Sequence, residues 1–288
     1  MTRRLLASAL LAGLAACSNI AGNDAENTSG AEALEAGAPQ SPLATTTMAS
    51  PVGPAQLAAI RRKAAASPDD TNAQSTLIGA LLSNGLGDEA LKRALSLQAR
   101  KPNAPDIHLL VGDARGLHGD FRGAAEEYRK AATLAFNEST AMRLIEALRR
   151  SDQADAADHV LARFLQNNPR SVPAQMLAAS RAMEMRRWGD AIQRYEALRA
   201  DLGDDDAVLL NNLAWAYSER GNLAAALPLA EKAWQLDPDN PAMADTYGWL
   251  LFRSGRDRRK GLALLERAAR AAPGNADIRR RLEKARGR

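Results

Sequence analysis

The chain has 288 residues, of which 46% are apolar but only 4% aromatic, and its formal net charge is +4. Much of the apolar content is alanine instead of aromatic residues. Because alanine is the best helix former, this composition favours a helical protein. If Arg3 and Arg4 are removed with a leader, 36 basic residues face 34 acidic ones, a net of +2. This balance excludes a global nucleic-acid-binding surface, so we expect no nucleic-acid partner.

The chain begins with a pattern typical of export. Arg3 and Arg4 are followed by 12 apolar residues ending at Ala16, a run too short for a membrane span, which needs about 20 residues, but suitable for a signal peptide. The run closes in the sequence LAAC, which resembles the lipobox of bacterial lipoproteins. The resemblance implies that residues 1–16 are removed and that lipid is attached to Cys17, the single cysteine. The alternative is an ordinary secretory signal in which the cysteine is incidental.

Residues 17–54 are expected to form a lipidated, disordered linker. They are rich in Ala, Gly, Ser, Thr, Asn and Pro and show no periodic apolar face, so they cannot bury enough surface to offset the entropy of ordering. Cys17 is not followed by the Asp that usually retains lipoproteins at the inner membrane. The resemblance therefore implies a lipid anchor in a bacterial cell envelope, in the outer membrane and facing the periplasm.

From residue 71 the chain repeats itself. A small residue recurs at intervals of 33 to 35, at Ala90, Ala124, Ala157, Ala191, Ala226 and Gly261. Five residues earlier a glycine stands in four of the six units, whereas Asp152 and Arg186 replace it in the other two. Apolar residues before the turn predict a first helix with one buried face, the glycine ends that helix, and the small residue lets a second helix pack closely.

This pattern resembles the tetratricopeptide repeat (TPR), best in residues 207–240. The resemblance implies an all-α fold: a right-handed α-solenoid of about six helix-turn-helix repeats with capping helices, over residues 55–288. The units are expected at residues 71–104, 105–137, 138–171, 172–206, 207–240 and 241–274. Because arrays need capped ends, we expect a helix over residues 54–67 and a charged capping helix over residues 275–288.

No catalytic or metal-binding motif is present. His108, His118 and His159 have no ligand or catalytic spacing with one another or with carboxylates, and phosphate-binding loops and HExxH sequences are absent. We therefore expect no enzyme activity, no metal and no cofactor.

Charge is uneven along the last units. Residues 201–250 carry nine acidic and two basic residues, whereas residues 251–288 carry 13 basic and four acidic ones. The run Arg279, Arg280 and Arg281 is a possible basic contact for an anionic lipid, a polysaccharide or an acidic partner. The alternative is a solvated capping helix.

In the family that the repeats resemble, the first helix of every unit lines a concave face where peptides or partner helices dock. The resemblance therefore implies an exposed partner-binding groove lined by Met142, Met176, Met183, Asn211, Trp215, Trp249 and Phe252. Large apolar groups on such a surface are candidates for anchoring a partner. The alternative is that Trp215 and Trp249 serve packing between repeats. Some members of that family hold the C-terminal carboxylate of a partner with a clamp of Lys and Asn side chains. The corresponding positions of this chain are Ser75, Leu109, Asp113 and Glu146, so we do not expect such a clamp.

These features favour a lipid-anchored cell-envelope scaffold that binds a protein or peptide partner in its groove. Such a scaffold would act in assembly or secretion of a surface structure, of the exopolysaccharide/exosortase type or the pilus type. Two alternatives remain open at this point: a polysaccharide-binding envelope module that uses the basic C-terminal end, and an accessory subunit of an envelope enzyme.

Overall fold

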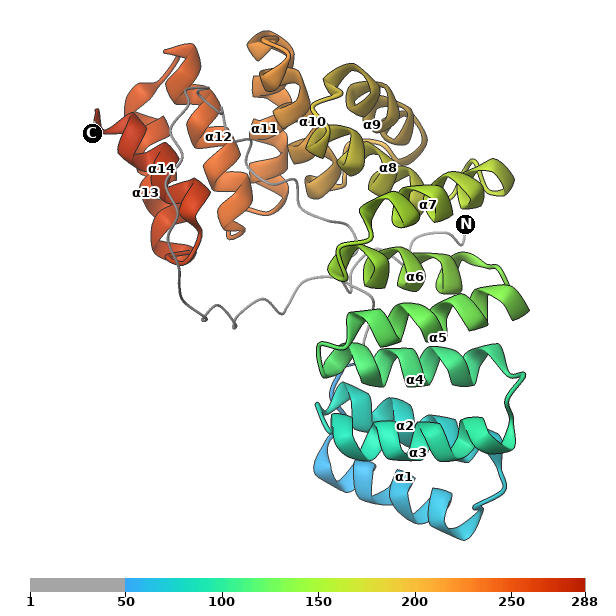
Figure 1. Ribbon diagram of the computed structural model, residues 1–288. Coiled ribbons are helices and arrows are strands. Elements are labelled where there is room, and N and C mark those ends of the chain that lie inside the picture. The colour runs from blue at the N-terminus through green and yellow to red at the C-terminus, as the bar shows by residue number, and fades with distance from the viewer. Residues whose placement is uncertain (1–49, 288) are drawn as a thin grey trace, which may run out of the picture. The chain divides into compact units, whose positions relative to one another are not determined.

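The computed structural model describes residues 50–287, and all of its regular structure over this range is α-helix. Helices of 10 to 15 residues follow one another with short turns between them (Figure 1). In chain order they are α1 (Pro54–Ala66), α2 (Thr71–Ser83), α3 (Gly87–Arg100), α4 (Pro105–Leu117), α5 (Phe121–Leu134), α6 (Glu138–Arg150), α7 (Ala154–Asn167), α8 (Val172–Glu184), α9 (Trp188–Leu202), α10 (Ala207–Glu219), α11 (Leu223–Leu236), α12 (Pro241–Ser254), α13 (Arg258–Ala271) and α14 (Ala276–Ala285).

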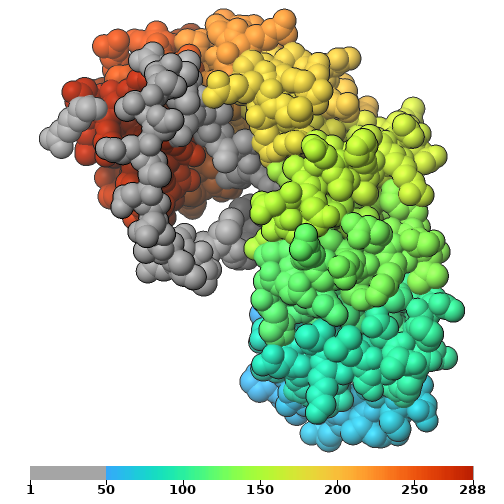
Figure 2. Space-filling view, viewed as in Figure 1, coloured from blue at the N-terminus to red at the C-terminus, as the bar shows by residue number. Residues whose placement is uncertain are grey.

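The helices pack pairwise in chain order, which confirms the predicted helical solenoid. Each predicted unit contains two helices, and α1 and α14 flank the six pairs. In Figure 2 the colours succeed one another in the same order, because each pair packs on the pair before it and the pair after it. The first helices also contact one another at α2–α4, α8–α10, α10–α12 and α12–α14. We call the surface formed by α2, α4, α6, α8, α10, α12 and α14 the first-helix face.

The turns inside the pairs explain the repeated glycine. Gly85, Gly119 and Gly221 have φ angles between 71° and 83°, a left-handed region that glycine enters without steric cost. Asp152 and Arg186 have φ angles of 58° and 56° at the corresponding turns. The two degenerate units therefore make the same turn as the others, and each holds a non-glycine residue in a conformation that costs about 1–2 kcal/mol.

Small residues bring the two helices of a pair together. Each of the six recurring small residues is buried on the second helix of its pair. Between α12 and α13 the two backbones meet directly, because a Cβ on Gly261 would lie 2.7 Å from the backbone oxygen of Gly248. Alanine-rich helices that approach so closely leave little space for aromatic rings, which accounts for the low aromatic content.

Several expectations from the sequence lie outside the described residues. These are the signal peptide (residues 1–16), the proposed lipidation at Cys17, and the linker as far as residue 49. Across residues 50–287, every helix is too short or too polar to pass through a bilayer.

Candidate functional site

The seven residues predicted to line a groove all lie on first helices. They occupy α6 (Met142), α8 (Met176, Met183), α10 (Asn211, Trp215) and α12 (Trp249, Phe252). The seven residues are therefore distributed along the first-helix face over four helices.

The expectation that these residues form an exposed strip is wrong for five of the seven. The side chains of Met142, Met176, Met183, Asn211 and Trp215 are buried. Because alanine-rich first helices pack directly against their neighbours, the large flexible methionines fill the space between helices instead of facing solvent. Met176, Met183 and Trp215 belong to the apolar core that runs from α8 to α14.

Trp249 and Phe252 on α12 remain partly exposed. Their rings stack with 6.0 Å between centroids and an interplanar angle of 18°. The guanidinium of Arg258 lies over the Phe252 ring, 5.4 Å from its centroid. This aromatic pair is the part of the predicted strip that still offers apolar surface to a partner.

Asn211 and Trp215 are buried but incompletely hydrogen-bonded. They lie four residues apart on α10 and therefore on the same side of the helix. Asn211 Oδ1 and Trp215 Nε1 have no hydrogen-bond partner, although the two residues are only 6% and 7% exposed. Asn211 Oδ1 is an acceptor and Trp215 Nε1 is a donor. Buried polar atoms without a partner are rare, because each lowers the free energy of unfolding by about 1–3 kcal/mol.

A buried ion pair lies beside Trp215. Asp245 on α12 accepts hydrogen bonds from Nε and Nη2 of Arg281 on α14, with 3.0 Å between Nε and Oδ1. The same guanidinium lies over the Trp215 ring, 5.1 Å from its centroid. Burial raises the pKa of Asp245 above its usual range, and the charge of Arg281 opposes that rise. Arg281 thus connects α14, α12 and α10 on the first-helix face.

The predicted basic contact is therefore not a row of three free cations. Arg281 is engaged with Asp245 and Trp215, Arg280 pairs with Asp277, and Arg279 donates to the backbone oxygen of Pro273. Arg279 and Arg280 are exposed, whereas Arg281 is largely buried.

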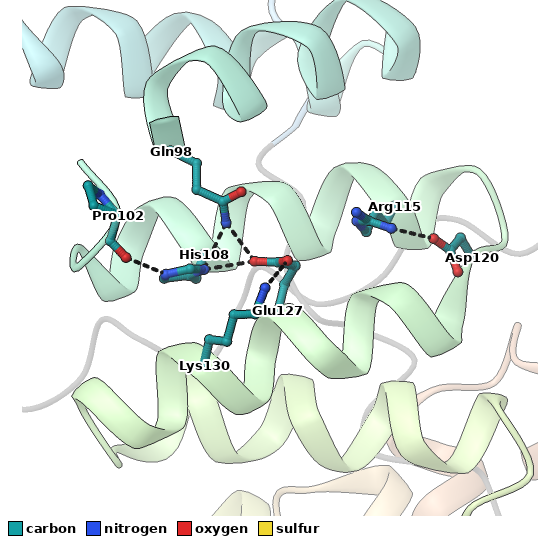
Figure 3. Close-up of polar contacts among 7 residues, drawn as sticks. All are labelled: Gln98, Pro102, His108, Arg115, Asp120, Glu127 and Lys130. Carbon is teal, nitrogen blue, oxygen red and sulfur yellow. Dashed lines mark hydrogen bonds and ion pairs between the residues drawn. The ribbon is translucent and has the colours of Figure 1, made fainter. Parts of the chain in front are cut away.

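A second buried polar cluster joins α3, α4 and α5, and the sequence analysis missed it (Figure 3). His108 Nδ1 lies 2.7 Å from Glu127 Oε2, and His108 Nε2 lies 2.8 Å from the backbone oxygen of Pro102. Gln98 and Lys130 donate to the two oxygens of Glu127. The histidine and the carboxylate are 19 residues apart, so only the packing of α4 on α5 brings them together.

Hydrogen bonds to Glu127 favour its ionised form. Both ring nitrogens of His108 lie within hydrogen-bonding distance of oxygen atoms, Nδ1 of Glu127 Oε2 and Nε2 of the backbone oxygen of Pro102. Burial tends to raise the pKa of Glu127, but hydrogen bonds from Lys130, His108 and Gln98 outweigh it and lower that pKa. All nitrogen and oxygen atoms of the two side chains are hydrogen-bonded, so the cluster is a closed structural network. Among residues 50–287, no group of three His, Cys, Asp or Glu side chains is arranged to hold a metal ion.

Asp113, at one of the positions that correspond to the carboxylate clamp, makes its contacts within the fold. Asp113 on α4 accepts hydrogen bonds from Tyr128 Oη at 2.7 Å and from Arg143 Nε at 3.0 Å. Burial and the neighbouring Asp113 raise the pKa of Tyr128 well above its usual range, so the phenol remains a donor. These contacts link neighbouring helices and leave the Asp113 carboxylate satisfied.

Comparison with known proteins agrees with this architecture. No protein-family model matches the chain. A TPR repeat-containing protein of Pseudomonas aeruginosa is 31% identical over 114 residues, which are 38% of this chain and 19% of that protein. The chain thus spans about a fifth of the length of this curated relative.

Solved structures match over a larger part of the chain. A tetratricopeptide repeat protein from Parabacteroides merdae superposes with a TM-score of 0.60 at 14% identity, covering 80% of this chain and 90% of that one. A TPR protein from Cytophaga hutchinsonii gives 0.56 at 17% identity, with coverage of 73% and 84%. The APC/C hetero-tetramer Cut9–Hcn1 gives 0.66 at 14% identity, covering 80% of this chain and 45% of that one. At these identities the likeness establishes the fold.

Proposed function

We propose that the first-helix face binds a peptide segment of a partner protein, because the chain has the fold of tetratricopeptide repeat proteins, which generally serve as scaffolds for protein–protein interactions. The binding region comprises the partly exposed Trp249 and Phe252 on α12, together with Asn211 and Trp215 on α10, whose buried polar atoms a peptide reaches only when the side chains that cover them move. No catalytic role is proposed for any residue.

The unpartnered atoms of α10 are the observation that carries this proposal. Trp215 Nε1 is a donor and Asn211 Oδ1 is an acceptor, and both lack a partner within the described chain. A peptide backbone supplies the complementary pair, a carbonyl oxygen and an N–H group, in every residue. The stacked rings of Trp249 and Phe252 add a partly exposed apolar surface for a side chain of the same peptide.

The chain offers a matched control for a direct test. Trp234 on α11 also has a buried indole N–H without a partner, but it lies on a second helix. Heptapeptides would be selected by phage display against the full-length chain carrying Cys17→Ser, and their affinities measured for further variants. Trp215→Phe should weaken binding by about tenfold, since one hydrogen bond to the peptide is lost, whereas Trp234→Phe should leave it unchanged. Equal effects of the two substitutions, with circular dichroism showing intact folding, would refute the proposed location.

We further propose that the scaffold is held in a bacterial cell envelope by lipid on Cys17, at the outer membrane and facing the periplasm. There it would assist assembly or secretion of a surface structure, of the exopolysaccharide/exosortase type or the pilus type. The support is the LAAC sequence at residues 14–17 and the polar linker that follows it. Labelled fatty acid should enter the wild-type chain but not Cys17→Ser, and unchanged labelling of the variant would disprove the anchor.

A further inference from the structure

The ion pair at the C-terminal end of the first-helix face defines the kind of peptide that fits there. Resting on the proposed function above, we propose that Asp245 and Trp215 form an arginine-binding subsite, and that Arg281 of α14 occupies this subsite until an arginine-bearing peptide replaces it.

Asp245 is built to hold a guanidinium. Its side chain is only 4% exposed, and both of its oxygens accept from the same arginine. Parallel donation from two guanidinium nitrogens to two carboxylate oxygens is a geometry that an ammonium group cannot reproduce. The Trp215 ring adds a flat π surface under the same group. A carboxylate beside an indole therefore selects arginine over lysine and over neutral side chains.

The present occupant satisfies only part of this site. Arg281 contributes its guanidinium, but it leaves the Trp215 Nε1 donor and the Asn211 Oδ1 acceptor without partners. An extended peptide that carries arginine can supply the guanidinium and also a backbone carbonyl and N–H group. Such a peptide therefore makes contacts that α14 does not make.

The helix that carries Arg281 is lightly held. α14 has 10 residues, and Ile278 is the only one of them that is buried. Helices of this length are marginal on their own, so their order depends on packing contacts. Arg286 at its end pairs with Glu266 at a partly exposed position, where such pairs contribute little. When the Arg281 side chain leaves, Ile278 is the one buried residue that still holds α14, and Asp245 needs another guanidinium to stay paired.

Charge at the subsite favours the same class of partner. Burial raises the pKa of Asp245, and the negative charge of the nearby Asp277 adds to that rise, whereas Arg281 opposes it. Once Arg281 leaves, these two carboxylates attract a cationic segment and repel an acidic one.

The test uses two blocked heptapeptides, one with a central arginine between alanines and one with citrulline, its neutral isostere. Binding to the full-length chain carrying Cys17→Ser is followed by the indole N–H NMR signal of Trp215, assigned from its loss in Trp215→Phe. Arg281→Gln should bind the arginine peptide about tenfold more tightly than the parent chain, because the internal competitor is gone. Lys284→Gln removes one positive charge from an exposed position of the same helix and should leave the affinity unchanged.

Asp245→Asn, introduced together with Arg281→Gln, should abolish the preference for arginine over citrulline. If both peptides shift the Trp215 signal equally in Arg281→Gln, the peptide site stands and the arginine subsite is refuted. If Arg281→Gln and Lys284→Gln change the affinity alike, Arg281 is not a competing occupant and the inference fails. If neither peptide shifts the signal in any variant, the subsite is refuted, and the phage-selected peptides alone decide whether a peptide site exists.

Discussion

The two buried polar clusters of this solenoid differ in how completely they are satisfied. In the α4–α5 pair, every nitrogen and oxygen of the His108 and Glu127 side chains has a hydrogen-bond partner. On α10, Asn211 Oδ1 and Trp215 Nε1 have none, although both residues are buried. A complete network stabilises the fold and specifies it, whereas an incomplete one is costly unless a ligand completes it. The difference separates a structural cluster from a candidate binding site on the same scaffold.

The helix pairs α4–α5 and α12–α13 also differ in how closely their backbones approach. At α4–α5, Tyr128 lies against Gly112, so a glycine faces an aromatic side chain. At α12–α13, Gly248 faces Gly261 and the two backbones are in contact. The glycine of the first helix therefore packs against an aromatic ring in one helix pair and against the backbone of the second helix in the other. One repeat pattern thus allows different packing inside its helix pairs.

Removing one member of the α4–α5 cluster should have the largest effect. His108→Leu leaves Glu127 buried with fewer donors and deprives the Pro102 carbonyl of its partner, so we expect a loss of about 3 kcal/mol in the free energy of unfolding. Glu127→Leu should cost clearly less. A neutral His108 can still donate from Nε2 to Pro102 and accept at Nδ1 from Gln98, which lies 2.8 Å away. Urea denaturation of both variants measures the difference, and equal losses would contradict the proposed network.

Adding a side chain at the glycine contact between α12 and α13 should have the next largest effect on the free energy of unfolding. A Cβ at Gly261 would lie 2.7 Å from the backbone oxygen of Gly248 and 3.0 Å from the backbone nitrogen of Phe252. Because backbone atoms cannot swing aside, Gly261→Ala should lower the free energy of unfolding by about 2 kcal/mol. The control is Gly79→Ala on α2, where no atom lies within 4 Å; it should stabilise the chain by about 0.5–1 kcal/mol. A stabilising Gly261→Ala would show that the two helices can separate without cost.

The incomplete cluster on α10 should respond in the opposite direction to the complete one. Asn211→Leu replaces a buried, unpartnered acceptor with an apolar side chain of similar size. We expect the free energy of unfolding to rise by about 1 kcal/mol, while affinity for the selected heptapeptides falls. Thermal denaturation and peptide titration of the same sample measure both quantities. A destabilised variant would mean that Oδ1 is satisfied in solution, which would remove the contrast between the two clusters.

Acid should weaken the α4–α5 cluster, and this is the smallest expected effect. The pKa of Glu127 is lowered from its ordinary value of 4.5, so the folded chain binds its proton more weakly than the unfolded chain does. The stabilisation is therefore complete above pH 4.5 and is lost as the pH falls through the lower, folded-state pKa. The gap in unfolding free energy between the wild-type chain and Glu127→Leu should shrink over that range. A gap that is independent of pH would show that the Glu127 charge does not stabilise the fold.

The sequence by itself was sufficient for the architecture. Recurring small residues at 33 to 35 positions predicted helix pairs, and the structure has two helices in each unit. The degenerate turns were not predicted: Asp152 and Arg186 adopt the left-handed conformation of the glycines they replace, against their own backbone preference. The helix pairs themselves depend on periodicity, which is a property of the sequence alone.

Only the tertiary structure decided which side chains are exposed to a partner and which pair with one another. Met183 and Trp215 were expected to face a partner and instead pack in the core, because the exposure of a first-helix residue depends on how closely its neighbours approach. The pairing of His108 with Glu127 and of Arg281 with Asp245 also escaped the sequence analysis. The members of these pairs are 19 and 36 residues apart, and the distance between their atoms follows from how separate helices pack, which no local pattern encodes.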